Sequence, residues 1–186
     1  MPGQIRQLNE LTTLCHRRWN IPLLAYFAKL EGARFAQIQK ALELNRQPLR
    51  DTLDALLELG YVRRNPGHGH PLRPEYILRA KGRRVAPACA KLMSFLEKQE
   101  LVELAGRKWS LPVIASLASG ATRFADLNQT LNKVSPRALA LSIRSLENSG
   151  LLIRKVEGIH PPAVRYELSS LGRKLAAKLN AILSTS

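Results

Sequence analysis

The 186 residues include 29 lysines and arginines against 14 acidic residues, a formal net charge of +15, and 45% of them are hydrophobic. That hydrophobic content supports a packed core and is far from the composition of a disordered chain. The charge favours a polyanionic partner, nucleic acid first, because neutralised phosphates release their counterions.

Targeting and redox features are few. The first residues, MPGQIRQLNELTTL, lack the apolar core of a signal peptide, and no stretch approaches the ~20 apolar residues of a membrane span. Two cysteines make no disulfide framework for this length, so we expect Cys15 and Cys89 to be reduced. The sequence therefore predicts a cytoplasmic, nucleoid-associated protein without a membrane partner.

In chain order, the sequence passes twice through one series of motifs, with an offset of about half its length. The pairs that share this offset are Trp19 and Trp109, Pro22 and Pro112, Gly60 and Gly150, Arg64 and Arg154, His70 and His160, Tyr76 and Tyr166, and Gly82 and Gly172. The offset slips by one residue at Phe35 and Phe124, and recovers before Asn45 and Ser135. Both halves carry an excess of basic residues. We therefore predict two similar domains, 1–92 with an N-terminal helix and 93–186 with a linker and a C-terminal helix.

Each copy is predicted to contain three helices and a hairpin. Asn20 is expected to cap the first helix, with Pro22 in the first turn, and Ser110 takes the same place in the second copy. A second helix lies in RFAQIQKAL and RFADLNQTL, and Gly60 and Gly150 end the third. The segments YVRRNPGHGHPLRPEYIL and LLIRKVEGIHPPAVRYEL then predict β-hairpins. The fold class is mainly α with small β-hairpins (α+β), as tandem winged helix-turn-helix domains joined by a helical linker.

Two further helices are predicted outside these motifs. The linker RRVAPACAKLMSFLEKQELVELAG is mostly helix-forming despite Pro87, and LGRKLAAKLNAIL places apolar residues along one face. These helices either clasp the modules together or bind another chain. The protein is accordingly expected to be a monomer acting as a pseudo-dimer, or a homodimer through its terminal helices.

The motifs GRKW, SGATRFADL, SPRALALSIRSLENSGLLIR and HPPAVRYELSSLG follow one another in the second copy. Through this ordered set, the second copy resembles the HxlR-type winged-helix transcriptional regulators of the MarR-like superfamily. The first copy matches more loosely, through RRW, EGARFAQI, LRDTLDALLELGYVRR and PEYILRAKG. The resemblance implies a binder of double-stranded DNA in which two modules, dimeric in single-module members, are fused. Redox-sensing members place a cysteine well upstream of the tryptophan, where this chain has Arg6 and Leu96, so thiol sensing does not carry over.

The third helix of each copy is the predicted recognition helix, whose outward residues follow from the helical period. Arginine suits guanine and glutamine suits adenine, so the expected base-reading residues are Arg46, Gln47, Arg50, Ser135, Arg137 and Arg144. Ala140 and Leu141 are also turned outward. The alternative for Arg50 is a solvated surface pair with Asp54. The two aspartates of the first recognition helix leave open whether that module reads bases, so we expect two unequal readers and a nonpalindromic site.

Contacts to the DNA backbone are predicted at the second helices and in the wings. Arg34 and Arg123 stand just before the phenylalanine that opens each second helix, where helix N-termini meet phosphate. The wing candidates are Arg63, Arg64, His70, Arg73, Arg154, Lys155, His160 and Arg165. The alternative for these hairpins is a merely solvated charged surface.

No catalytic motif or metal-ligand set emerges, and no cofactor is expected. The pair His68 and His70 lacks a second pair with ligand spacing. Trp19 and Trp109 are expected in the core rather than against a ligand. The leading hypothesis is a sequence-specific regulator of transcription, against a non-specific architectural DNA- or RNA-binding protein or one module serving as a protein-interaction domain. The sequence leaves open whether a small-molecule effector binds.

Overall fold

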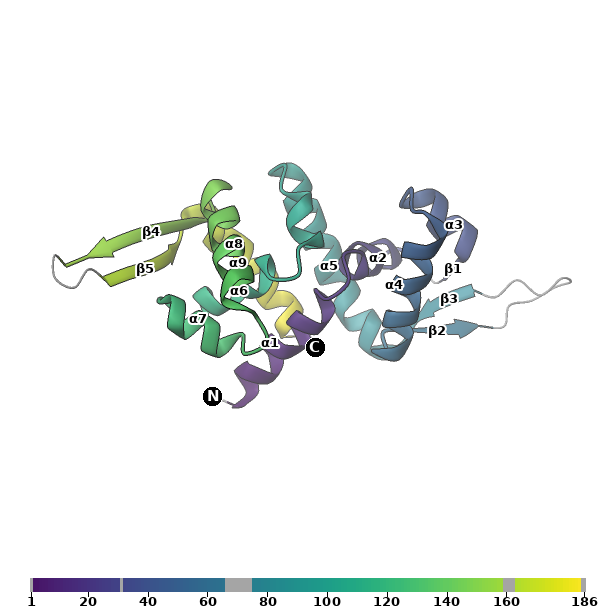
Figure 1. Cartoon of the computed structure of the whole chain (residues 1–186). Helices are drawn as coiled ribbons and strands as arrows, with labels where there is room; N and C mark the ends of the chain where they lie inside the picture. Colours follow the sequence, from purple (N-terminus) through teal and green to yellow (C-terminus); the bar gives the residue numbers. More distant parts are fainter. Residues whose placement is uncertain (1, 31, 66–74, 159–162, 185–186) are drawn as a thin grey trace, which may run out of the picture.

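The computed structural model describes residues 2–30, 32–65, 75–158 and 163–184, and it arranges them as two winged helix-turn-helix modules along an elongated molecule (Figure 1). The first module comprises α1 (Pro2–Leu14), α2 (Asn20–Phe27), β1 (Ala33–Arg34), α3 (Phe35–Ala41), α4 (Arg46–Glu58), β2 (Val62–Asn65) and β3 (Glu75–Leu78). The helix α5 (Ala80–Lys98) and the short 3-10 helix η1 (Val102–Gly106) lead into the second module. That module comprises α6 (Ser110–Ala118), α7 (Phe124–Thr130), α8 (Pro136–Asn148), β4 (Leu152–Glu157), β5 (Ala163–Leu168) and α9 (Ser170–Leu183). The predicted fold class and the order of helices and hairpin in each copy are confirmed.

The start of α2 differs from the prediction. Asn20 is the first helical residue and is fully buried, while Trp19 occupies the N-cap position. The Asn20 amide Nδ2 donates to the carbonyl oxygen of Leu14 at 3.0 Å, so the side chain fastens the end of α1 instead of capping α2. Ser110 takes the same buried position at the start of α6, behind Trp109. The predicted caps at Asn20 and Ser110 are therefore wrong, because tertiary packing buries both side chains.

The two predicted recognition helices, α4 and α8, form as expected. Each buries one leucine-rich face, and each is followed by a glycine in the left-handed region, Gly60 at φ +73° and Gly150 at φ +66°. Glycine adopts this conformation without a Cβ penalty, so it stops each helix. The residues before the helices, Asn45 and Ser135, are both extended N-caps, as the recovered repeat register predicts.

The wings are antiparallel hairpins, β2 with β3 and β4 with β5. Arg64 lies opposite Tyr76 and Arg154 opposite Tyr166, so the repeat register holds in the strands. The sequence did not predict β1, which adds a third strand beside β3. In the second module, where the corresponding loop is one residue shorter, one bond from the Tyr166 amide to the Thr122 carbonyl at 2.8 Å stands in its place.

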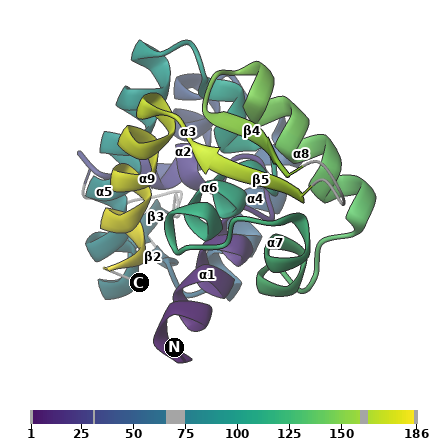
Figure 2. The same ribbon diagram turned by 90° about the vertical axis from the view of Figure 1, so that its left-hand side faces the viewer.

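Helices from both modules form the centre of the molecule. The linker helix α5 packs against α2 and along α9, and α1 crosses to contact α6 and α9 (Figure 2). The buried leucines of α5 and α9 belong to one hydrophobic core that continues through both modules. The linker helix α5 and the C-terminal helix α9 thus clasp the modules together, one of the two predicted arrangements. The domain boundary expected at residues 92 and 93 lies within α5 and stays a prediction. No helix in the described parts of the chain is long and apolar enough to cross a membrane.

Candidate nucleic-acid interface

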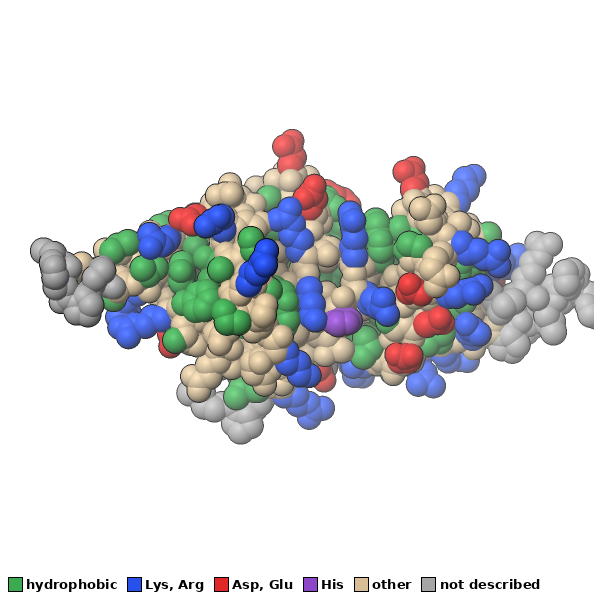
Figure 3. Space-filling model, in the orientation of Figure 1, with side chains coloured by type: hydrophobic (Ala, Val, Ile, Leu, Met, Phe, Trp, Pro, Cys, Tyr) green, Lys and Arg blue, Asp and Glu red, His purple; other side chains and the backbone are tan. Residues whose placement is uncertain are grey.

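The recognition helices α4 and α8 lie on one side of the molecule, and α5 and α9 lie on the other (Figures 1 and 2). Figure 3 shows the face that carries α4 and α8, with lysine and arginine side chains spread across both modules and the region between them. A single surface therefore presents both helices together with basic side chains of both modules.

On α4, the three side chains predicted to read bases are all exposed: Arg46, Gln47 and Arg50. Gln47 already has a partner, because its Nε2 donates to Asp51 Oδ1 at 2.7 Å. The two arginines, by contrast, line a shallow cavity of about 380 Å³ together with Phe35, Arg64 and Tyr76. The recognition helix and the wing of this module thus share one arginine-rich hollow.

The acidic residue Asp54 pairs with the wing and not within its own helix. Its Oδ1 lies 3.6 Å from Arg64 NH2, and the same guanidinium stands 5.8 Å from the ring centroid of Tyr76. The alternative that Arg50 pairs with Asp54 is therefore wrong, because β2 brings Arg64 to this carboxylate. Arg50 has no ion-pair partner among the described residues, which leaves its guanidinium available.

On α8, Arg137, Ala140, Leu141 and Arg144 are exposed, as the helical period predicts. Leu141, a large apolar side chain on this outward face, is 58% exposed. The hydroxyl of Ser135 accepts the Ala138 amide at 3.3 Å, so this predicted base reader also serves as the N-cap. Arg137 and Arg144 have no ion-pair partner in the described part of the chain.

The two arginines that precede α3 and α7 differ in their contacts. Arg34 Nε lies 3.5 Å from Glu75 Oε1 on β3, whereas Arg123 is exposed and has no acidic partner among the residues that the structure describes. The backbone amide of Arg123 is held by Asp126 Oδ2 at 3.0 Å, which fixes the start of α7. Of the two arginines predicted to contact the DNA backbone, Arg123 is therefore the one whose side chain is not engaged by an acidic residue among those that the structure describes.

The wings contain both free and paired cations. Arg63 and Arg154 are exposed, without an ion pair in the described ranges. In the second wing, Lys155 Nζ lies 2.8 Å from Glu167 Oε2, and Arg165 Nε lies 2.8 Å from Glu157 Oε2. Such exposed pairs contribute little to stability, but they reduce the positive charge of this wing. Three predicted wing residues lie outside the described residues: His70, Arg73 and His160.

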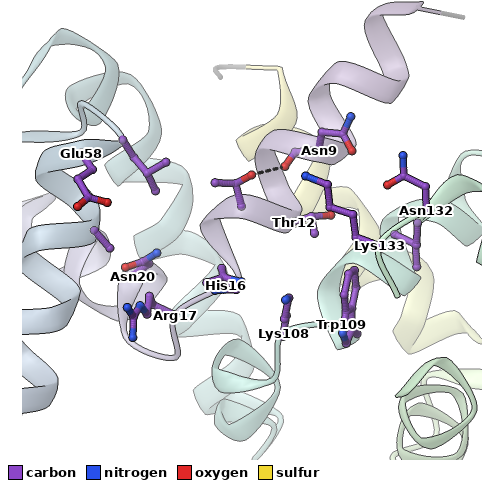
Figure 4. A pocket seen from close by; sticks show the side chains of 14 residues that line it. Asn9, Thr12, His16, Arg17, Asn20, Glu58, Lys108, Trp109, Asn132 and Lys133 are labelled. Atoms are coloured by element: carbon purple, nitrogen blue, oxygen red, sulfur yellow. Dashed lines mark hydrogen bonds between the residues drawn. The ribbon is translucent and has the colours of Figure 1, made fainter. Parts of the chain in front are cut away.

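A group of three cationic side chains and a histidine that sequence reasoning did not single out lies between the modules (Figure 4). This seam cluster consists of His16, Arg17, Lys108 and Lys133, which line a cavity of about 450 Å³. Trp109 lines it too, and the Lys108 ammonium stands 5.0 Å from the ring centroid. The motifs HRRW and GRKW carried the signal, since each places basic residues before a tryptophan. Both tryptophans are half-buried and pack against the core, as expected, but Trp109 also faces this cavity.

Cys15 and Cys89 are free thiols, both fully buried. Burial raises the pKa of Cys89 to about 12, and burial together with the neighbouring Cys89 raises the pKa of Cys15 further above its usual value. Neither thiol is therefore an accessible thiolate near neutral pH. Among the described residues, no group of three or more His, Cys, Asp or Glu is placed to hold a metal ion.

Comparison with known proteins gives a consistent set of relatives. A family model described as HxlR-like helix-turn-helix matches residues 14–102 and again 104–185. An HTH-type transcriptional regulator of Methanothermobacter thermautotrophicus is 36% identical over 77 residues, which cover 41% of this chain and 59% of the relative. The HTH-type transcriptional regulator YtfH of Escherichia coli is 32% identical over 84 residues, 45% of this chain and 67% of YtfH. The reduced form of the transcriptional regulator YodB from B. subtilis is 26% identical, with a TM-score of 0.43 over 47% of this chain and 86% of that chain.

Proposed function

Because this chain belongs to the HxlR-like helix-turn-helix family, with two family modules in tandem, we propose that it is a sequence-specific regulator of transcription that binds double-stranded DNA. Its relatives are HTH-type transcriptional regulators, of which the matches span 59% and 67%. The net charge of +15 supports the same partner through phosphate neutralisation.

The observation that carries the proposal is the placement of α4 and α8 on one face of a single chain (Figure 1). Each helix exposes arginines without ion-pair partners in the described residues, Arg46 and Arg50 on α4, and Arg137 and Arg144 on α8. Arginine is the side chain best suited to the O6 and N7 atoms of guanine in the major groove. Two such helices, held by a shared core, imitate a dimer within a monomer.

The two modules are proposed to read different sequences. In α4, the Gln47 amide donates to Asp51 and Arg64 pairs with Asp54. This helix therefore offers arginines beside one carboxylate that is paired with a cation and one that keeps its charge. In α8, the outward face is two arginines around the apolar Leu141. Helices with such different side chains do not match identical half-sites, and a nonpalindromic site follows.

The test begins with selection of bound fragments from genomic DNA, followed by competition titrations of a selected duplex against random duplex. We expect a preference on the order of 10³ or more at physiological salt. Equal affinity for every sequence would contradict the proposed regulator and favour the architectural alternative. Such a protein shows a steep fall of affinity with salt concentration and no sequence preference.

Paired substitutions assign the reading to each module. We expect Arg137→Ala with Arg144→Ala, and separately Arg46→Ala with Arg50→Ala, to weaken specific binding by roughly 1–3 kcal/mol for each arginine that reads a base. The matched control is Lys174→Ala with Lys178→Ala, which removes the same charge from exposed positions of α9 on the other side. If only the α8 pair acts, the first module does not read bases and a protein-interaction role gains support.

The pseudo-dimer proposal also fixes the stoichiometry. Because α5 packs along α9 within one chain, the helical surfaces that would pair two chains are already in contact. We expect one chain per duplex in analytical ultracentrifugation, and two chains per duplex would favour the homodimer instead.

A further inference from the structure

The cavity between the modules is bounded by both of them. One wall comes from α1 and the last turn of α4, ending at Glu58 and Leu59. The opposite wall comes from Lys108 and Trp109, before α6, and from the turn between α7 and α8 that holds Lys133. The cavity therefore adjoins the end of one recognition helix and the approach to the other. Neither module contains it alone.

The charge around this cavity is largely uncompensated. The seam cluster contributes two lysine side chains from the second module and Arg17 from the first, against the single carboxylate of Glu58. Arg17, Lys108 and Lys133 have no ion-pair partner in the described ranges. Like charges in a hollow repel one another, and an anion that enters relieves the repulsion.

The pKa of His16 is consistent with this positive potential. The pKa of His16 is lowered from its usual value chiefly by Lys108, then by partial burial, and then by Arg17. Figure 4 shows these side chains around a common space, with His16 and Lys108 on facing segments. The three cationic side chains and His16 are thus close neighbours around one cavity.

The geometry of duplex DNA indicates which anion lies opposite. Two recognition helices that enter successive major grooves on one face of a duplex sit about 34–36 Å apart, one helical turn. Between those two grooves runs the minor groove, bordered by a phosphate backbone on either side. A protein surface between the two helices therefore faces phosphates.

We propose that the seam cluster binds the sugar-phosphate backbone of DNA between the two sequences that α4 and α8 read. This inference rests on the proposed function, because it requires both helices to engage one duplex. The contact belongs to the tandem arrangement, since each wall supplies part of it. It adds affinity without reading bases, and it sets the spacing between the two sites.

The first experiment compares charge changes of equal size at two places. The seam variant carries Arg17→Gln, Lys108→Gln and Lys133→Gln, and the control carries Lys91→Gln, Lys98→Gln and Lys174→Gln on the exposed surfaces of α5 and α9. With a selected duplex, we expect the seam variant to bind ten- to a hundredfold more weakly and to lose about 2 to 3 from the slope of log affinity against log salt concentration. The control should change both quantities much less.

A second experiment locates the contact on the DNA. Neutral methylphosphonate linkages replace the phosphates at the centre of the selected site, between the two footprints. They should weaken wild-type binding by about as much as the seam variant does, and weaken the variant itself little further. Additive losses would overturn the proposal, because they would place the cluster elsewhere.

The proposal would also be overturned if the seam variant and wild type had equal affinity and equal dependence on salt concentration. A small anion would then be the remaining candidate ligand of the cavity. Single variants, Arg17→Gln and Lys133→Gln, cover the case in which the triple variant fails to fold. If the proposed function itself is wrong, the result is different, since wild type would then show no preference for the selected duplex. Failure of the seam contact alone leaves that preference intact.

Discussion

Asp54 of the first recognition helix lies 3.6 Å from Arg64 of the adjacent wing, so the helix and the wing of that module are joined by an ion pair. Both side chains are about half exposed, at 49% and 60%. A pair this exposed contributes little to stability. We expect a larger effect on DNA binding, because the pair withdraws Arg64 from the surface that is proposed to face DNA.

Substitution Asp54→Asn is therefore expected to tighten duplex binding. It frees Arg64 and removes a negative charge from the face that carries α4, for a gain on the order of 0.5–1 kcal/mol and a salt slope steeper by up to ~0.9. Glu97→Gln removes the same charge from an exposed position on α5 and serves as control. Titrations of duplex at several salt concentrations measure both, and indistinguishable results for the two variants would contradict the role of this pair.

The repeat predicted the local structure within each module, because equivalent residues of the two modules have equivalent neighbours. Asn45 and Ser135 are both N-caps, and Gly60 and Gly150 both end a helix, since local backbone requirements are legible in residue type. The seam cluster was missed for a physical reason. It depends on how two modules pack, and a period within one chain holds no information on that packing.

Two other outcomes depended on tertiary contacts as well. Asn20 has the residue type of an N-cap, but its amide is used by Leu14, a residue of the preceding helix. Asp54 has the spacing to pair with Arg50, yet the wing brings Arg64 to it. In both cases the helix was predicted correctly, but the side chain contacts a neighbouring element instead of its own helix.

The glycines Gly82 and Gly172 lie in the first turns of the helices that follow each wing, α5 and α9, and alanine is expected to destabilise the protein at both positions. A Cβ at either position would stand 2.1 Å from a backbone oxygen, that of Tyr61 in the first module and of Leu151 in the second. Because a backbone oxygen cannot move aside cheaply, each Gly→Ala variant should lose on the order of 1–3 kcal/mol of unfolding free energy. Urea denaturation measures the loss.

The control for these variants is Gly3→Ala in α1, where an added Cβ meets no atom within 4 Å. Its stability should stay the same or rise slightly, since alanine favours the helix. Equal stability of Gly82→Ala and wild type would show that this helix start can shift away from the Tyr61 carbonyl.

Leu141 is expected to recognise the methyl group of a thymine. It is 58% exposed between two arginines of α8, where an apolar side chain gains nothing from water. Replacing thymines of the selected site one by one with uracil removes one methyl group at a time. At one position the loss should be about 0.8 kcal/mol for wild type, roughly fourfold in affinity, and near zero for Leu141→Ala. A uracil effect that persists in the variant would assign the methyl contact to another residue.

Cys15 and Cys89 are expected to react only when the chain opens. Burial raises the pKa of Cys89 from its ordinary 9.0 to about 12, so near pH 8 its thiolate fraction is lower by a factor on the order of 10³. A chromogenic disulfide reagent should therefore label the thiols slowly in the native protein and rapidly in denaturant. Fast stoichiometric labelling of the native protein would contradict the buried positions.

The same shift predicts how stability changes with alkaline pH. Above pH 9 the unfolded chain releases thiol protons that the folded chain retains, so the unfolded state binds fewer protons and the free energy of unfolding falls as pH rises toward 12. The double variant Cys15→Ala and Cys89→Ala lacks both groups, so its stability should decline less steeply over this range. Tyr61, whose pKa is raised to about 12 chiefly by burial, is present in both proteins, so the part of its titration that burial causes is common to both. The two cysteines also raise the pKa of Tyr61, so their removal reduces the slope through this tyrosine in the same direction. Because the measured quantity is the slope of stability against pH, a constant loss from the smaller side chains does not obscure it, and parallel slopes would show that the thiols titrate alike in the folded and unfolded chains.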